Sequence, residues 1–212
     1  NEHSDNGIKF FGPDGYKLSD SSELEIEALV SKGIGCVPPE DIGRAKRIDD
    51  GRYRYIERVK SSFPNQMRLD GLKVVIDCAN GAGYKAAPEV LWELGAEVIP
   101  VGVSPDGRNI NLDCGSTNPT VAAETVVAHA ADVAICLDGD ADRVLIIDEF
   151  GRPIDGDQFL GMIGSRWFKN GNLVENTLVS TVMSNMGLEA FLKQEGIKLV
   201  RTSVGDRYVA VS

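Results

Sequence analysis

Residues 134–148 read AICLDGDADRVLIID, in which two apolar runs of strand length flank a short acidic loop. Asp138, Asp140 and Asp142 stand on alternate residues of that loop, and Arg143 follows directly. Three carboxylates held this close repel one another unless a cation lies between them, because each can then donate an oxygen to one hard ion. A plain polar turn would suit Asp and Gly, but it needs fewer acidic groups. The stretch therefore predicts a β-hairpin that carries a divalent metal beside an anion.

Two other interpretations of the loop are weaker. An EF-hand would place Glu149 at its twelfth position, but Arg143 stands where the sharp turn needs glycine, and strand-like runs replace the flanking helices. A phosphatase would use Asp138 as a nucleophile after an apolar strand. That alternative stays open, although it gives Asp142 and Arg143 no purpose. A Mg²⁺ site, with the guanidinium fork of Arg143 facing a phosphate, gives every charged residue of the loop a role.

The bulk composition limits the classes of partner. The 212 residues are 42% apolar and 25% charged, as expected of a globular protein with a buried core. A formal net charge of −10 argues against a nucleic-acid groove or an anionic membrane surface as the main partner. An anionic small substrate remains compatible, because basic groups and a metal can reverse the sign of the charge within one cleft.

The cysteines indicate a reducing compartment. Cys36, Cys78, Cys114 and Cys136 are far apart and form no CxxC pair. No apolar run reaches membrane-spanning length, and nothing resembles a signal peptide. We therefore expect free thiols, a cytoplasmic location and no membrane partner.

Strand and helix patterns alternate along most of the chain. Apolar runs at 73–78 and 97–101 are typical of strands in a sheet covered on both faces. A strand–helix–strand pattern over 177–200 predicts two parallel strands, because such crossovers are right-handed. Helices are expected from about residue 21 to Gly33, and over 41–61, 121–129 and 157–168. This alternation predicts an α/β protein whose sheet becomes mixed at the hairpin.

Three further segments are less informative when taken alone. The glycines of NGAGYKA at 80–86 would suit a dinucleotide loop, but they begin beyond the strand, so a tight strand-to-helix turn is the better interpretation. Lys9 by itself is an ordinary surface residue. The loop VGDRY at 204–208 follows a predicted strand, which is where open α/β sheets bind ligands.

Together these segments resemble the α-D-phosphohexomutase superfamily, in particular its branch that acts on glucosamine phosphates. The matching stretches cover nearly the whole chain: DNGIKFFGPDGYKL (5–18), VVIDCANGAGYKAAPEVLWELGAEVIP (74–100), DGDADRVLIIDEFGRPIDGDQ (138–158), VMSNMGLE (182–189) and VGDRYV (204–209). The resemblance implies mixed-sheet α/β domains of the phosphohexomutase type, with one complete domain flanked by parts of two others. We expect residues 1–40 to end a first domain, 41–170 to form a second that carries the metal loop, and 171–212 to begin a third.

The resemblance also implies a reaction. Glucosamine 6-phosphate would become glucosamine 1-phosphate through a phosphoserine enzyme and a bisphosphate intermediate, supplying the synthesis of UDP-N-acetylglucosamine, a cell-wall precursor. Asp138, Asp140 and Asp142 would bind Mg²⁺, and Arg143 would contact the transferring phosphate. Lys9 would act as a general acid or base or bind phosphate. Gly205, Asp206 and Arg207 would bind substrate.

The chain departs from the family pattern at its start. Asn1 matches the asparagine of the family's Ser-His-Asn-Pro motif, so the phosphorylated serine is expected two residues before it, and Glu2 replaces the usual proline. The sugar-binding loop and the fourth domain are expected beyond Ser212. We therefore expect an internal piece that is inactive alone. A phosphomannomutase or phosphoglucomutase, and a non-catalytic metal- or phosphate-binding module, stay open as alternatives, as does a homodimer of the full-length protein.

Overall fold

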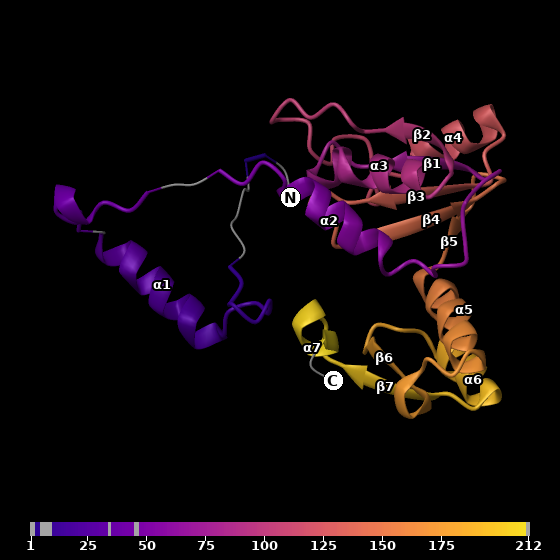
Figure 1. The fold of residues 1–212 in the computed structure, drawn as a ribbon. Helices are drawn as coiled ribbons and strands as arrows, with labels where there is room; N and C mark the ends of the chain where they lie inside the picture. The colour runs from indigo at the N-terminus through magenta and orange to yellow at the C-terminus, as the bar shows by residue number, and fades with distance from the viewer. Residues whose placement is uncertain (1–2, 5–9, 34, 45–46, 211–212) are drawn as a thin grey trace.

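The computed structural model describes residues 3–4, 10–33, 35–44 and 47–210, which form two α/β units preceded by a separate helix (Figure 1). That helix, α1 (Asp20–Lys32), begins where Ser19 Oγ accepts a hydrogen bond from the Ser22 amide, and it ends at Gly33. None of its residues is buried. Before it, Phe11 forms an isolated bridge with Lys17. Within the described chain, helix α1 therefore does not pack against a hydrophobic core.

The helix expected over 41–61 is shorter than predicted. A 3₁₀ turn, η1 (Pro39–Asp41), is followed by residues 42–44 and 47–50, which are not helical, and α2 (Gly51–Lys60) begins only after Asp50. Arg54, one turn into α2, donates a hydrogen bond from its Nε to Asp50 Oδ2 at 2.8 Å. Aspartate and glycine favour turns and the first positions of helices. The pair at 50–51 therefore sets the start of α2, although residues with high helix propensity precede it.

The first unit, residues 51–154, contains a five-stranded sheet with the strand order β2-β1-β3-β4-β5. Strand β1 (Lys73–Asp77) is parallel to both β2 (Glu97–Val101) and β3 (Val133–Leu137). Strand β4 (Val144–Asp148) runs antiparallel to β3, and β5 (Pro153–Ile154) is antiparallel to β4. The mixed sheet and the predicted hairpin are confirmed. Because β1 and β3 are parallel, their carboxyl ends lie at one edge of the sheet, next to the acidic loop.

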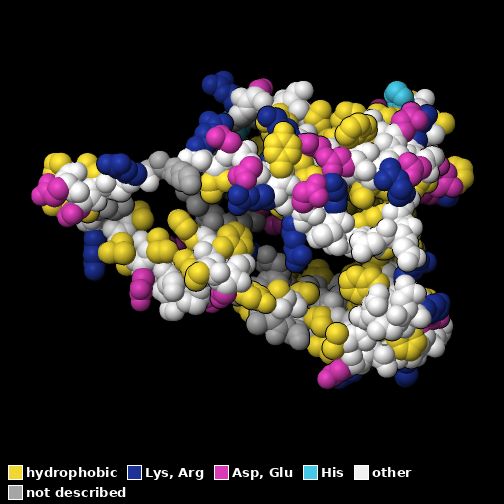
Figure 2. Space-filling view, in the orientation of Figure 1, with side chains coloured by type: hydrophobic (Ala, Val, Ile, Leu, Met, Phe, Trp, Pro, Cys, Tyr) yellow, Lys and Arg dark blue, Asp and Glu magenta, His cyan; other side chains and the backbone are white. Residues whose placement is uncertain are grey.

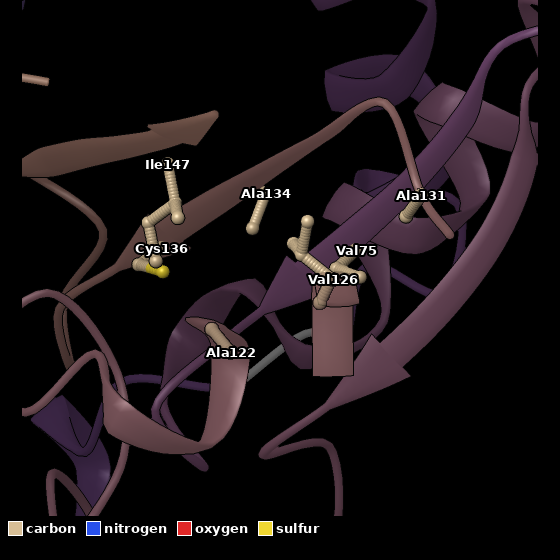
Figure 3. Close-up of a cluster of buried hydrophobic side chains, with 7 residues drawn as sticks. All are labelled: Val75, Ala122, Val126, Ala131, Ala134, Cys136 and Ile147. Atoms are coloured by element: carbon tan, nitrogen blue, oxygen red, sulfur yellow. The ribbon is translucent and has the colours of Figure 1, made fainter. Parts of the chain in front are cut away.

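Helices cover the sheet of this unit. The connections from β1 to β2 and from β2 to β3 step across the sheet in opposite directions, so right-handed crossovers put α3 (Ala86–Glu93), preceded by η2 (Ala82–Tyr84), and α4 (Thr120–His129) on opposite faces. The main cluster joins α4 to strands β1, β3 and β4 and contains Val75, Ala122, Val126, Ala131, Ala134, Cys136 and Ile147 (Figure 3). On the face that Figure 2 shows, acidic and basic side chains are interspersed with hydrophobic ones.

The second unit, residues 156–210, has a core of its own. Strands β6 (Thr177–Thr181) and β7 (Lys198–Thr202) pair in parallel, which confirms the predicted crossover. Helix α6 (Met186–Glu195) connects them, η3 (Val174–Asn176) precedes them, and α7 (Asp206–Ala210) follows. The buried cluster is Leu178, Leu188, Leu192 and Ile197.

Helix α5 (Gly156–Lys169) packs with this second unit. Leu160 and Phe168 of α5 contact the second cluster, and a Cβ built on Gly161 would lie 3.2 Å from the ring of Phe191 in α6. Glycine thus lets the two helices approach closely. These contacts favour a division before α5, whereas the division at residue 170 expected from sequence groups α5 with the preceding strands. Among the described helices, none has the length and apolar character needed to cross a bilayer.

The buried thiols provide a test of the fold. Burial, together with the charge of Asp77, raises the pKa of Cys78 and of Cys136 to about 12, and raises the pKa of Cys114 as well. Cys36 is exposed. A thiol with a pKa of 12 is about 10⁻⁴ ionised at pH 8, and the thiolate is the reactive form. We therefore expect a thiol reagent such as DTNB to label one cysteine rapidly at pH 8, and the remainder only in denaturant. Cys36→Ser should abolish the rapid phase; rapid labelling of more than one thiol would contradict the packing.

Candidate metal and phosphate site

The acidic loop is a tight turn between β3 and β4. The Ala141 amide donates to the Asp138 carbonyl at 3.0 Å, and the Asp138 amide donates to the Arg143 carbonyl at 3.3 Å. Ala141 adopts a left-handed conformation with φ of 60°. These local bonds fold the segment back on itself within six residues, so the loop geometry follows from the DGDADR sequence and the hairpin pairing together.

The three aspartates come together as predicted. Asp138 is buried at 1% exposure, whereas Asp140 and Asp142 are exposed. One carboxylate oxygen from each of the three lies within 4.8 Å of the others. Oxygens that share a Mg²⁺ ion lie about 3 to 4 Å apart, since each is about 2.1 Å from the metal. Small rotations of the two exposed side chains would close the remaining gap, and the all-oxygen donor set suits a hard divalent ion.

Arg143 is bound to the buried member of the cluster. Its amide donates to Asp138 Oδ1 at 3.0 Å, its Nε donates to Asp138 Oδ2 at 2.9 Å, and Nε lies 3.8 Å from Asp142 Oδ1. These bonds compensate the desolvation of the Asp138 carboxylate. Within the described residues, the guanidinium group of Arg143 contacts Asp138 and Asp142 through Nε. Its two terminal nitrogens can therefore face an anion on the exposed side of the loop.

The glycine-rich segment at 80–83 packs against the acidic loop. The Ala82 amide donates to the Gly139 carbonyl at 2.8 Å, and a Cβ built on Gly81 would lie only 2.1 Å from that oxygen. Glycine at 81 is required by this close approach of two backbones. The glycine pattern that would also suit a dinucleotide loop thus supports the acidic loop.

Two further residues lie at this edge of the sheet and were not predicted from the sequence. Asp77 ends β1, is fully buried, and accepts hydrogen bonds from the amides of Ala79 at 2.9 Å and Gly115 at 2.7 Å. Asn111 lies beside Gly139, since a Cβ built there would be 2.7 Å from Asn111 Nδ2. Asn111 Oδ1 is buried without a hydrogen-bond partner among the described residues. Such an acceptor is expected where water or a ligand completes a site. An aspartate ending an apolar strand is the one sequence signal that could have pointed to Asp77.

The other predicted site residues are less well defined. Lys9 lies outside the described residues. Gly205 has a φ of 137° and precedes α7, where its carbonyl accepts from the Tyr208 amide at 3.1 Å. Asp206 and Arg207 form the first turn of α7, but their side chains lie outside the described part of the chain. Their assignment to substrate stays a prediction.

Two family models match consecutive parts of the chain. The phosphoglucomutase/phosphomannomutase alpha/beta/alpha domain II matches residues 53–151, and domain III of the same family matches residues 155–212. Together they account for about three quarters of the chain. The chain belongs to the phosphoglucomutase/phosphomannomutase family. The gap between the two matches falls before α5, in agreement with the packing of that helix.

Similar proteins include two bacterial phosphoglucosamine mutases. Those of Roseobacter denitrificans and of Ruegeria sp. are 69% and 68% identical over 209 residues, which is 99% of this chain but 46% and 47% of theirs. The chain thus spans about half the length of the curated relatives it matches.

Solved structures show the same fold at low identity. A phosphoglucomutase/phosphomannomutase family protein from Burkholderia thailandensis is 20% identical, with a TM-score of 0.64 over 76% of this chain and 34% of that one. An N-acetylglucosamine-phosphate mutase in its substrate complex is 18% identical, with a TM-score of 0.56 over 78% of this chain and 35% of that one.

The contact between Arg143 and Asp138 predicts an effect on ion affinity. In Arg143→Gln, a positive charge that neighbours the acidic cluster is removed, so a divalent cation should bind about fivefold more tightly in the absence of phosphate. Titration calorimetry with Mg²⁺ or Mn²⁺ would measure this change.

Arg152 offers a matched control. Its amide and Nε bind Asp148 Oδ1 and Oδ2, both at 2.9 Å, in the same arrangement at the far end of β4. Arg152→Gln should therefore leave the ion affinity unchanged. Weaker ion binding in Arg143→Gln would contradict the assignment of Arg143 as a competing cation.

Proposed function

We propose that the protein containing this chain is a phosphoglucosamine mutase that interconverts glucosamine 6-phosphate and glucosamine 1-phosphate. The observation that carries the proposal is the acidic loop, where three carboxylates that suit a divalent ion and an arginine that suits a phosphate share six residues. The names of relatives with 69% and 68% identity across nearly the whole chain support the choice of sugar. The proposal includes Mg²⁺ as the ion and a cytoplasmic location, which the free cysteines support.

In this proposal Asp138, Asp140 and Asp142 hold Mg²⁺. When bound, the ion supplies positive charge to the oxygens of a transferring phosphoryl group. Phosphoryl transfer depends mainly on positioning and charge stabilisation, so the protein needs rigid, correctly signed groups more than a strong nucleophile.

Arg143 has the second role at the loop. Asp138 holds its guanidinium through Nε, so the terminal nitrogens can bind two phosphate oxygens without first ordering the side chain. The buried aspartate thus serves both the ion and the arginine. The negative charge of the three carboxylates would otherwise repel a phosphate dianion, and Arg143 offsets part of this repulsion.

The proposed reaction has two transfers. In the first, the bond from phosphorus to the serine oxygen breaks and a bond to the sugar C1 hydroxyl oxygen forms, while that hydroxyl loses its proton to a base and the serine oxygen takes one up. The bisphosphate then turns over. In the second, the bond from phosphorus to the C6 oxygen breaks and a bond to the serine oxygen forms, while the serine hydroxyl loses its proton and the C6 oxygen takes one up. The phosphorylated serine is proposed to precede Asn1. Lys9 is proposed to move the proton or to bind phosphate, and Gly205, Asp206 and Arg207 to bind the sugar phosphate.

Turnover tests this proposal. The full-length protein, purified with Mg²⁺, should convert glucosamine 6-phosphate into glucosamine 1-phosphate faster than it converts mannose or glucose phosphates. Asp140→Asn should lower kcat about 10²-fold, because it replaces a charged ion-binding carboxylate by a neutral amide and leaves the loop backbone intact. The 212-residue chain alone should give no product.

A nearby exposed aspartate serves as the control. Asp113 has a φ of 53°, which asparagine tolerates, so Asp113→Asn should retain activity. A full-length protein that prefers mannose or glucose phosphate would contradict the choice of sugar. No phosphoryl exchange with any hexose phosphate would support a binding module in place of an enzyme.

A further inference from the structure

Asp77 is a fully buried carboxylate that holds two loops through their backbones. It ends β1, and its exposed fraction is 0%. Oδ1 accepts from the Ala79 amide at 2.9 Å and Oδ2 accepts from the Gly115 amide at 2.7 Å. Backbone N–H groups thus compensate the burial of this charge. A carboxylate is needed here, because an amide would direct its own N–H groups at one of the two donors.

One of the two loops leads to the residue before Asp138. Gly115 is bound by Asp77, and the next residue, Ser116, donates its amide to the Leu137 carbonyl at 2.9 Å. Leu137 is the last residue of β3. A Cβ built on Gly115 would lie 2.6 Å from the same carbonyl oxygen, so the loop and the strand end are in close backbone contact. Asp77 therefore holds the end of β3 through two consecutive residues, Gly115 and Ser116.

The other loop leads to the residue after Asp138. Ala79 is bound by Asp77, and the Gly81 amide donates to the Cys78 carbonyl at 2.8 Å within the same turn. Ala82 then donates its amide to the Gly139 carbonyl at 2.8 Å. The residues on both sides of Asp138 are therefore held by loops that Asp77 anchors.

We propose that Asp77 is a positioning residue for the metal loop, holding Asp138 in register by fixing the carbonyls of Leu137 and Gly139. The proposal deepens the proposed function and rests on its assignment of a divalent ion to Asp138, Asp140 and Asp142. Asp77 does not need to touch the ion. Its carboxylate adds negative charge at the same edge of the sheet, because Asp77 is the register partner of Cys136, two residues before Asp138. Both effects favour cation binding.

Ion affinity separates positioning from a purely structural role. Mn²⁺ would be titrated into the full-length protein, and free Mn²⁺ measured by electron paramagnetic resonance. Asp77→Asn should raise the Mn²⁺ dissociation constant about tenfold, as loss of an outer support for metal ligands does in other proteins. The unfolding midpoint of each variant would be recorded alongside.

Asp132 provides a matched control within the same sheet. Its Oδ2 accepts from the Lys73 amide at 2.7 Å, at the opposite end of β1 from Asp77. Asp132→Asn disturbs a similar carboxylate-to-backbone bond, but far from the acidic loop. It should lower the unfolding midpoint without changing the Mn²⁺ dissociation constant.

The outcomes are distinguishable. A dissociation constant for Asp77→Asn within twofold of the unsubstituted protein would overturn the positioning role, as would an equal change in Asp132→Asn. Absence of Mn²⁺ binding by the unsubstituted protein would overturn the ion assignment and this proposal with it. Mn²⁺ binding that depends on Asp77, in a protein without mutase activity, would sustain this proposal and reject the proposed reaction.

If Asp77→Asn does not fold, a measurement on the unsubstituted protein still decides. Addition of Mg²⁺ should shift the amide resonances of Ala79 and Gly115, because the ion pulls on a loop to which both are linked. The Lys73 amide, bound to Asp132, should not move. Unchanged resonances at both Ala79 and Gly115 on saturation with Mg²⁺ would overturn the proposal.

Discussion

Repulsion among Asp138, Asp140 and Asp142 is the constraint on which this edge of the protein depends. A folded chain gathers three carboxylates only if other interactions offset that repulsion. Here Arg143 binds Asp138 through two donors, and hydrogen bonds from flanking loops hold the backbone on both sides of Asp138. An ion would offset the rest. The antiparallel pairing of β3 and β4 contributes as well, because it holds both ends of this short charged segment side by side.

The acidic loop could be predicted from the sequence because its contacts are local. Its three carboxylates and Arg143 lie within six residues, and the apolar runs on both sides require a hairpin. The parallel pairing of β6 and β7 was equally accessible, since a strand–helix–strand pattern has one favoured hand. Family resemblance added the expected chemistry, but the side chains of Asp206 and Arg207 lie outside the described structure, as does Lys9. Their roles therefore rest on the resemblance.

What the sequence could not predict depends on distant contacts. The bond between Asp77 and the Gly115 amide joins residues 38 positions apart, and the position of Asp77 at the end of an apolar strand does not identify Gly115 as its partner. The approach of Gly81 to Gly139 has the same character: a glycine in a turn has many explanations until the facing backbone is known. The contacts that group helix α5 with the second unit are likewise between residues far apart in the sequence. They join Leu160 and Phe168 to the second cluster and Gly161 to Phe191, and the sequence of α5 does not specify these partners.

These sequence separations bear on the order of folding. The bond from Arg143 to Asp138 closes a loop of only a few residues, and such closures are fast and entropically inexpensive. The link from Asp77 to Gly115 must await the pairing of β1 with β3 and the ordering of the segment between them. We therefore expect the carboxylates to be gathered early and held in their final register late. Pulse-labelled hydrogen exchange at the Arg143 and Gly115 amides would contradict this order if both became protected together.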